Sequence, residues 1–172
     1  MRWQLLEAIT DIVPGERASG RARTDFPDEL FADHFPSFPI VPGVLLVEAG
    51  AHLGGILVMA SVHAARGIIV FPVLSMIHEA KLRAFVPPSV SVGLRATLDT
   101  MRPEGALCRI VVERDGKRCA TMQLTFVFEP TGAVPGGDRE RLHSFLESEL
   151  ERLGSPWRPT ADSREPRATQ AS

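Results

Sequence analysis

The sequence contains no tyrosine, only two cysteines and almost no excess of charge of either sign. Cys108 and Cys119 are too few for a disulfide framework and lack the spacing of metal ligands, so we expect neither. A formal net charge of −2 over 172 residues provides no general attraction to nucleic acid or to anionic lipid. What remains is a globular protein whose 44% hydrophobic residues suffice for a core.

Residues 43–64, GVLLVEAGAHLGGILVMASVHA, are apolar over nearly the length that spans a bilayer. Glu48 and His52 lie inside this run, and an acid at the centre of a bilayer is costly. We therefore favour a helix buried inside a soluble fold over membrane insertion. The opening MRWQLLE becomes charged too early for the apolar part of a signal peptide, so we expect a cytoplasmic protein.

The pattern of apolar residues changes from helical to alternating along the chain. We expect, in order, strands over 2–13 and 17–24, a helical turn at 27–32, a long helix from 43 to about 66, strands over 68–85, 90–98, 106–113 and 118–128, and an amphipathic helix over 138–153. Asp115-Gly116 predicts a hairpin between the last two strands. The long helix is apolar on nearly every side, so the sequence predicts an α+β fold in which a twisted antiparallel sheet wraps around it.

Composition divides the chain into three parts. Residues 1–130 form the main domain, 131–154 a C-terminal extension, and 155–172 a polar tail without periodicity that we expect to be disordered. The apolar stripe of the amphipathic helix in the extension consists of Leu142, Phe145, Leu146, Leu150 and Leu153.

Residues 34–49, HFPSFPIVPGVLLVEA, concentrate the candidate chemistry. Three prolines, at every third position, fix φ and make a stiff connection that cannot itself be helical. Gly43 then opens the long helix, where unpaired N–H groups at the positive end of the helix dipole suit an oxyanion. His34 supplies an imidazole, a side chain that can accept or donate a proton, and Glu48 has apolar neighbours in the sequence. A histidine, an acid and an oxyanion site together suit acid–base chemistry beside a carbonyl group.

This stretch resembles the active-site motif of the β-hydroxyacyl-acyl carrier protein dehydratases of the FabA/FabZ type. Their pattern is HFPxxPxxPGxxxxEA, with Glu or Asp as the acid, and every fixed position matches. Weaker similarity extends over roughly residues 3–128. The resemblance implies a hot-dog fold and a homodimer in which the histidine of one chain meets the acid of the other, with further assembly of dimers left open.

The resemblance also implies a role for each site residue. His34 would take the α-proton of a 3-hydroxyacyl thioester, and Glu48 would assist the β-hydroxyl to leave as water. The N–H of Gly43 would hold the thioester carbonyl, and Ile40 and Val44 would line the substrate tunnel. The resemblance implies no metal and no dissociable cofactor, and it implies that the substrate arrives on the phosphopantetheine arm of an acyl carrier protein.

His52 stands where the family usually has glutamine. It follows Glu48 by four residues, so the two share a helix face and His52 could hydrogen-bond to the acid. The predicted reaction yields trans-2-enoyl thioesters for fatty acid or polyketide/polyene biosynthesis. Two alternatives stay open: an acyl thioesterase of the hot-dog fold, and a catalytically weak hot-dog subunit that acts as a binding or heterodimer partner.

Overall fold

The structure, a computed structural model, describes residues 4–32, 34–129 and 139–159. Its elements are β1 Leu6–Val13, β2 Arg17–Arg23, α1 Asp28–Ala32, α2 Gly43–Arg66, β3 Phe71–Leu82, β4 Ser91–Met101, β5 Gly105–Arg114, β6 Lys117–Glu129 and α3 Arg139–Arg152. Each helix and strand expected from the sequence is therefore present, with its ends shifted by a few residues.

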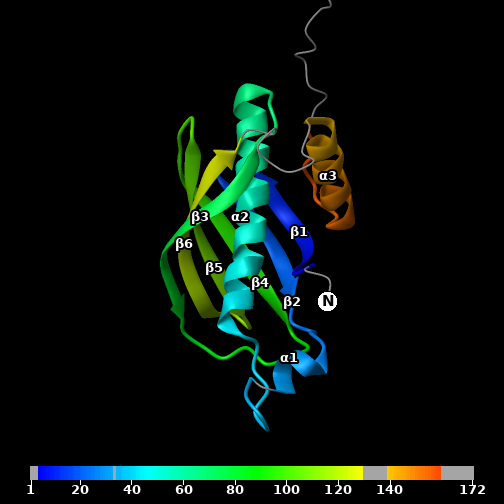
Figure 1. Ribbon diagram of the computed structural model, residues 1–172, viewed down its shortest axis with the longest axis vertical. Coiled ribbons are helices and arrows are strands. Elements are labelled where there is room, and N and C mark those ends of the chain that lie inside the picture. Colours follow the sequence, from blue (N-terminus) through cyan, green and yellow to red (C-terminus); the bar gives the residue numbers. More distant parts are fainter. Residues whose placement is uncertain (1–3, 33, 130–138, 160–172) are drawn as a thin grey trace, which may run out of the picture.

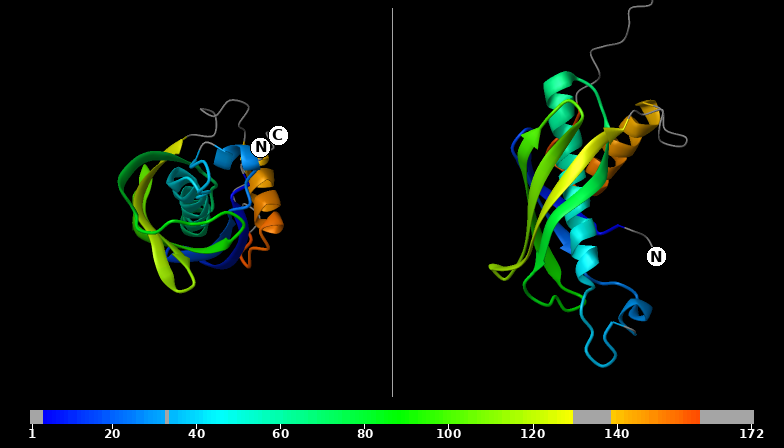
Figure 2. Two further views of the ribbon diagram at one scale, coloured as in Figure 1. Left: turned by 90° about the horizontal axis from the view of Figure 1, so that it is seen from below. Right: turned by 60° about the vertical axis from the view of Figure 1, so that its left-hand side comes forward.

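The six strands form one sheet in the order β1-β2-β4-β5-β6-β3, and every neighbouring pair is antiparallel. The sheet curls around α2, which runs through the middle of the molecule (Figure 1). Seen along that helix, the strands surround it on most sides (Figure 2). The predicted hot-dog arrangement of a helix wrapped by an antiparallel sheet is confirmed.

α2 is the core helix. Every residue from Leu53 to His63 is buried, and the helix ends at Gly67, whose left-handed φ of 66° lets its N–H donate to the His63 carbonyl. Within the described residues α2 is the one helix long and apolar enough to cross a membrane, but 72% of its apolar window is buried inside the protein. The apolar run is thus accounted for by the core.

The sheet has two edges, β1 and β3, and α3 covers the first (Figure 1). The Ile9 N–H donates to the Leu153 carbonyl at 2.9 Å, while Leu146 and Leu150 are fully buried. Phe145 departs from the predicted stripe, because its side chain is 53% exposed. It borders a cavity that residues of α2 also line.

The chain after α3 continues to pack against the domain through residue 159. Ser155 is buried, and the Trp157 ring meets the His63 ring edge-on with centroids 6.0 Å apart. The rest of the predicted tail, 160–172, and the first part of the predicted extension, 131–138, lie outside the described residues.

The other edge, β3, exposes apolar side chains. Met76, Ile77 and Leu82 are 55%, 49% and 54% exposed, and Phe85 just beyond the strand is 74% exposed. An edge strand of this length with apolar side chains is a surface that native proteins normally cover.

Candidate functional site

A cavity of about 370 Å³ lies at the N-terminal end of α2. The loop before the helix contributes His34 and Ile40, the helix begins with Gly43, and the far wall is the stretch 82–86 that follows β3. The structure therefore brings together three of the residues singled out in the sequence. The wall at 82–86 was not singled out, and its only sequence signal is the Pro87-Pro88 break after it.

His34 is held by its surroundings at both the backbone and the ring. Its N–H donates to the Phe31 carbonyl at 3.1 Å, and Nδ1 lies 3.3 Å from the Ile40 carbonyl oxygen. A carbonyl oxygen only accepts hydrogen bonds, so this contact places the ring proton on Nδ1. Nε2 is then the basic nitrogen, which is the form a proton acceptor needs.

Gly43 borders the same cavity as the first residue of α2. The preceding Pro42 supplies no side-chain cap, so the first N–H groups of the helix keep their capacity to donate. A Cβ at position 43 would overlap the Leu82 side chain, whose Cγ would be 3.2 Å away. The glycine thus leaves room for Leu82 and gives open access to the backbone at the helix start.

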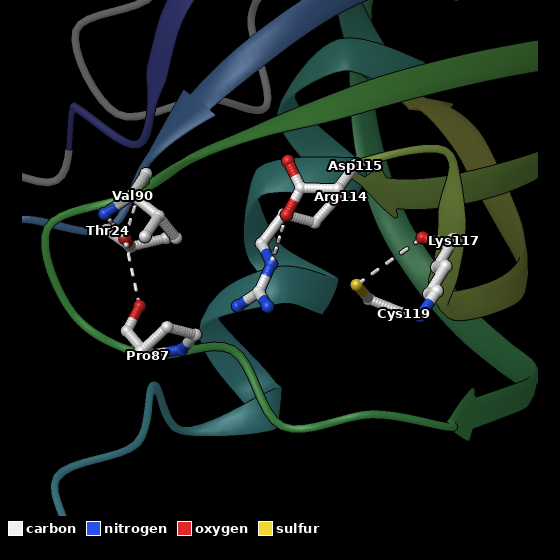
Figure 3. A network of polar contacts seen from close by, with 7 residues as sticks. All are labelled: Thr24, Pro87, Val90, Arg114, Asp115, Lys117 and Cys119. Carbon is white, nitrogen blue, oxygen red and sulfur yellow. Dashed lines mark hydrogen bonds and ion pairs between the residues drawn. The ribbon is translucent and has the colours of Figure 1, made fainter.

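Thr24, which is only 1% exposed, fixes the turn that follows the wall at 82–86 (Figure 3). Its hydroxyl donates to the Val90 carbonyl at 2.6 Å and accepts from the Val90 N–H at 2.8 Å. The Val41 N–H donates to the Val86 carbonyl at 2.8 Å, which ties the wall to the proline-rich loop. The wall itself is held to β6, because the Arg83 N–H donates to the Cys119 carbonyl at 2.7 Å.

Val44, Glu48 and His52 lie elsewhere, on the outward face of α2. Val44 is 71% exposed, and the Glu48 and His52 side chains are 42% and 37% exposed. The expected contact between the last two is present, with Nε2 of His52 2.9 Å from Oε1 of Glu48. The apolar environment expected for Glu48 is absent in the single chain, because this face of α2 points out of the sheet.

Within one chain, the predicted site residues therefore lie in two separate places. None of Val44, Glu48 or His52 lines the cavity that holds His34. His52 instead lines a second cavity, of about 470 Å³, between α2 and α3. Among the described residues no three His, Cys, Asp or Glu side chains cluster in a way that could hold a metal ion.

A long helix wrapped by an antiparallel sheet, with a histidine loop at the helix start and an acid on the helix, defines a hot-dog protein. The model of the FabA-like domain matches residues 1–123, and the chain belongs to that family. The resemblance to the FabA/FabZ dehydratases is therefore confirmed.

Two curated relatives are similar over the same part of the chain. The 3-hydroxyacyl-[acyl-carrier-protein] dehydratase FabZ of Ligilactobacillus salivarius is 34% identical over 123 residues, 72% of this chain and 86% of that protein. The FabZ of Clostridium acetobutylicum is 29% identical, over 72% of this chain and 85% of that protein.

Solved structures support the fold. Thioesterase HI1161 from Haemophilus influenzae matches with a TM-score of 0.53 and 17% identity, over 69% of this chain and 76% of that one. Protein PA5202 from Pseudomonas aeruginosa matches with a TM-score of 0.56 and 15% identity, over 71% and 87%. At these identities the similarity shows the fold alone and gives no information about thioester hydrolysis.

Proposed function

We propose that this protein dehydrates 3-hydroxyacyl thioesters, carried on acyl carrier protein, to trans-2-enoyl thioesters in fatty acid biosynthesis. The observation that carries the proposal is the cavity in which His34 and the start of α2 at Gly43 face the same space, within a motif that matches the dehydratases at every fixed position. The family match and the FabZ relatives support the same reaction.

The chemistry assigns one task to each group. Nε2 of His34 takes a proton from the carbon next to the thioester carbonyl, and the Gly43 N–H stabilises the negative charge that develops on the carbonyl oxygen. Glu48, in its acid form, gives a proton to the β-hydroxyl, which leaves as water while the double bond forms. Ile40 and Val44 border the substrate. Neither a metal nor a dissociable cofactor takes part in these steps.

The proposed active enzyme is a homodimer that pairs two β3 strands. In favour of this pairing, β3 is an edge strand with exposed Met76, Ile77 and Leu82, which a second copy would cover. A two-fold interface requires the same surface on both chains, and an antiparallel pair of identical strands satisfies that requirement.

This pairing also supports a site shared between chains. β3 starts at Phe71, which lines the His52 cavity, and ends at Leu82, which lines the His34 cavity. Antiparallel pairing sets the end of one strand beside the start of the other. The His34 cavity of one protomer then lies next to Glu48 of its partner, and the dimer covers the face of α2 that is exposed in one chain.

The substrate would be delivered by acyl carrier protein, and a soluble carrier supports a cytoplasmic location for the enzyme.

The test is to incubate the protein with 3-hydroxybutyryl-acyl carrier protein and to separate the products. We expect enoyl product, and we expect His34→Ala and Glu48→Gln each to abolish it. A Ser148→Ala variant, at an exposed position on α3, should retain full activity.

Two results would contradict the proposal. Release of free 3-hydroxybutyrate, lost in the Glu48→Gln variant, would identify a thioesterase. Binding of the carrier protein without turnover would identify a partner subunit that lacks its own activity.

A further inference from the structure

The second cavity, of about 470 Å³, occupies the seam where the wrapped sheet stays open between its two edges. β1 contributes Leu6 to its lining, and β3 contributes Phe71 and Pro72. α3 closes the outer side with Phe145 and Leu146. This volume falls within the range of small-molecule sites, about 300–1,000 Å³.

The interior of this cavity is apolar, and its ionisable side chains are already paired. Its floor on α2 consists of Ala51, Gly55, Ile56 and Met59. At the rim, His52 contacts Glu48 at 2.9 Å, and Arg152 contacts Glu149 at 2.7 Å. Arg152 also donates to the Leu6 carbonyl at 3.2 Å. A charged ligand would have to break these pairs, whereas an alkyl chain would only displace water from apolar surface.

The cavity begins beside the proposed acid. His52 lines it and contacts Glu48, and Met59 lies seven residues further along α2, about 10 Å at the usual helical rise. We infer that this cavity receives the acyl chain of the substrate beyond its reacting carbons, that α3 forms its outer wall, and that Phe145 helps to determine which chain lengths are accepted. The inference rests on the proposed function.

α3 is suited to be a wall because contacts with the domain hold it in place. Leu146 and Leu150 are fully buried, and the bond from the Ile9 N–H to the Leu153 carbonyl fixes its end. Phe145 is 53% exposed, so its ring is free to cover a bound chain. The helix also lies beyond residues 1–123, the part matched by the family model, so this wall is an addition to the family domain.

The test compares short and long chains in a binding assay that needs no turnover. Butanoyl- and dodecanoyl-pantetheine, which lack the 3-hydroxyl and cannot be dehydrated, are titrated by calorimetry into the full-length protein. We expect the dodecanoyl compound to bind at least tenfold more tightly, because each buried methylene contributes up to about fourfold in affinity. The same chain lengths of 3-hydroxyacyl-acyl carrier protein are then compared by kcat/KM.

Two variants probe the wall and the floor. Phe145→Ala should weaken dodecanoyl binding about tenfold and leave butanoyl binding unchanged, since half of a phenylalanine ring is lost from the wall. Gly55→Leu should fill the cavity and also weaken only the long chain, because a Cβ at position 55 meets Pro72 at an ordinary 3.7 Å. Ser148→Ala, exposed on α3, is the matched control, and circular dichroism checks folding.

The outcomes distinguish a failure of the acyl-chain assignment from a failure of the proposed dehydration reaction. Equal affinity for the two compounds in the wild type, or equal losses for both chain lengths in Phe145→Ala, would overturn the acyl-chain assignment even if dehydration is observed. A long-chain preference that both variants remove would support the assignment even if no substrate is dehydrated, and the proposed function alone would then fail.

Discussion

His52 and Glu48 form a pair on the outward face of α2, with Nε2 of His52 2.9 Å from Oε1 of Glu48. This contact fixes the orientation of the carboxyl group that donates the proton in the proposed mechanism. We therefore expect His52→Leu to lower kcat/KM by about 10- to 100-fold, the usual value of a hydrogen bond to an ionisable group. The measurement is the steady-state rate with 3-hydroxybutyryl-acyl carrier protein.

His52→Gln is the matched control, because an amide at the same position can still donate to Glu48. This variant should keep activity within about threefold of the wild type. Equal losses in the two variants would show that the size of the imidazole matters and that its hydrogen bond does not.

A mixture of two inactive variants tests whether the site is shared between chains. In a heterodimer of His34→Ala and Glu48→Gln, one shared site carries both substitutions and the other carries none. Random exchange of subunits at equal concentrations should therefore restore about a quarter of the wild-type activity. The variants are co-refolded or co-expressed, and the rate is compared with that of each variant alone.

A site contained within one chain predicts no recovery at any mixing ratio. Ile77→Lys, which places a charge on the exposed edge of β3, serves as a second control. It should reduce the mass in solution from dimer to monomer and abolish the recovery.

Thr24 should stabilise the protein through its buried hydroxyl. Thr24→Val keeps the shape but leaves the Val90 N–H and carbonyl without their partner, which should cost about 1–3 kcal/mol of unfolding free energy. At this chain length the midpoint of thermal unfolding should fall by roughly 3–10 °C. Thr24→Ser keeps the hydroxyl and should lie close to wild type; an equal fall would assign the effect to the lost methyl group.

Cys108 should be unreactive in the folded protein. Burial, with a smaller contribution from Asp99, raises the pKa of its thiol to about 12, whereas a thiol in the unfolded chain titrates near ~8.5. Between these values the folded state binds the proton more strongly, so unfolding free energy should fall as pH rises above about 9. The measurement is denaturant unfolding at pH 8 to 10.5, alongside labelling of native protein with a thiol reagent.

Cys108→Ala provides the comparison for this pH dependence. Although less stable overall, it should show a shallower decline above about pH 9, because the group that titrates is gone. Parallel declines in the two proteins, or rapid labelling of native Cys108 at pH 8, would contradict the assignment.

Local patterns were sufficient to predict the elements of this fold. Alternating apolar residues predicted the strands, and Asp115-Gly116 predicted the hairpin, because these signals depend on near neighbours in the chain. Phe145 departed from its predicted place because helical periodicity defines a stripe but not which part of it meets the sheet. Thr24 carries no local signal, since its partners Pro87 and Val90 are 63 and 66 residues away.

The sequence by itself determined the family, the wrapped helix and the identity of the candidate groups, because the motif from His34 to Glu48 is short, rigid and specific in its spacing. Only the tertiary structure decided how these groups are distributed. It placed His34 and Gly43 around one cavity, and it placed Glu48 and His52 on a different face of α2. It also set α3 against β1, so that residues distant in the sequence enclose a second cavity. Such contacts join residues far apart in the chain, so no local pattern specifies them.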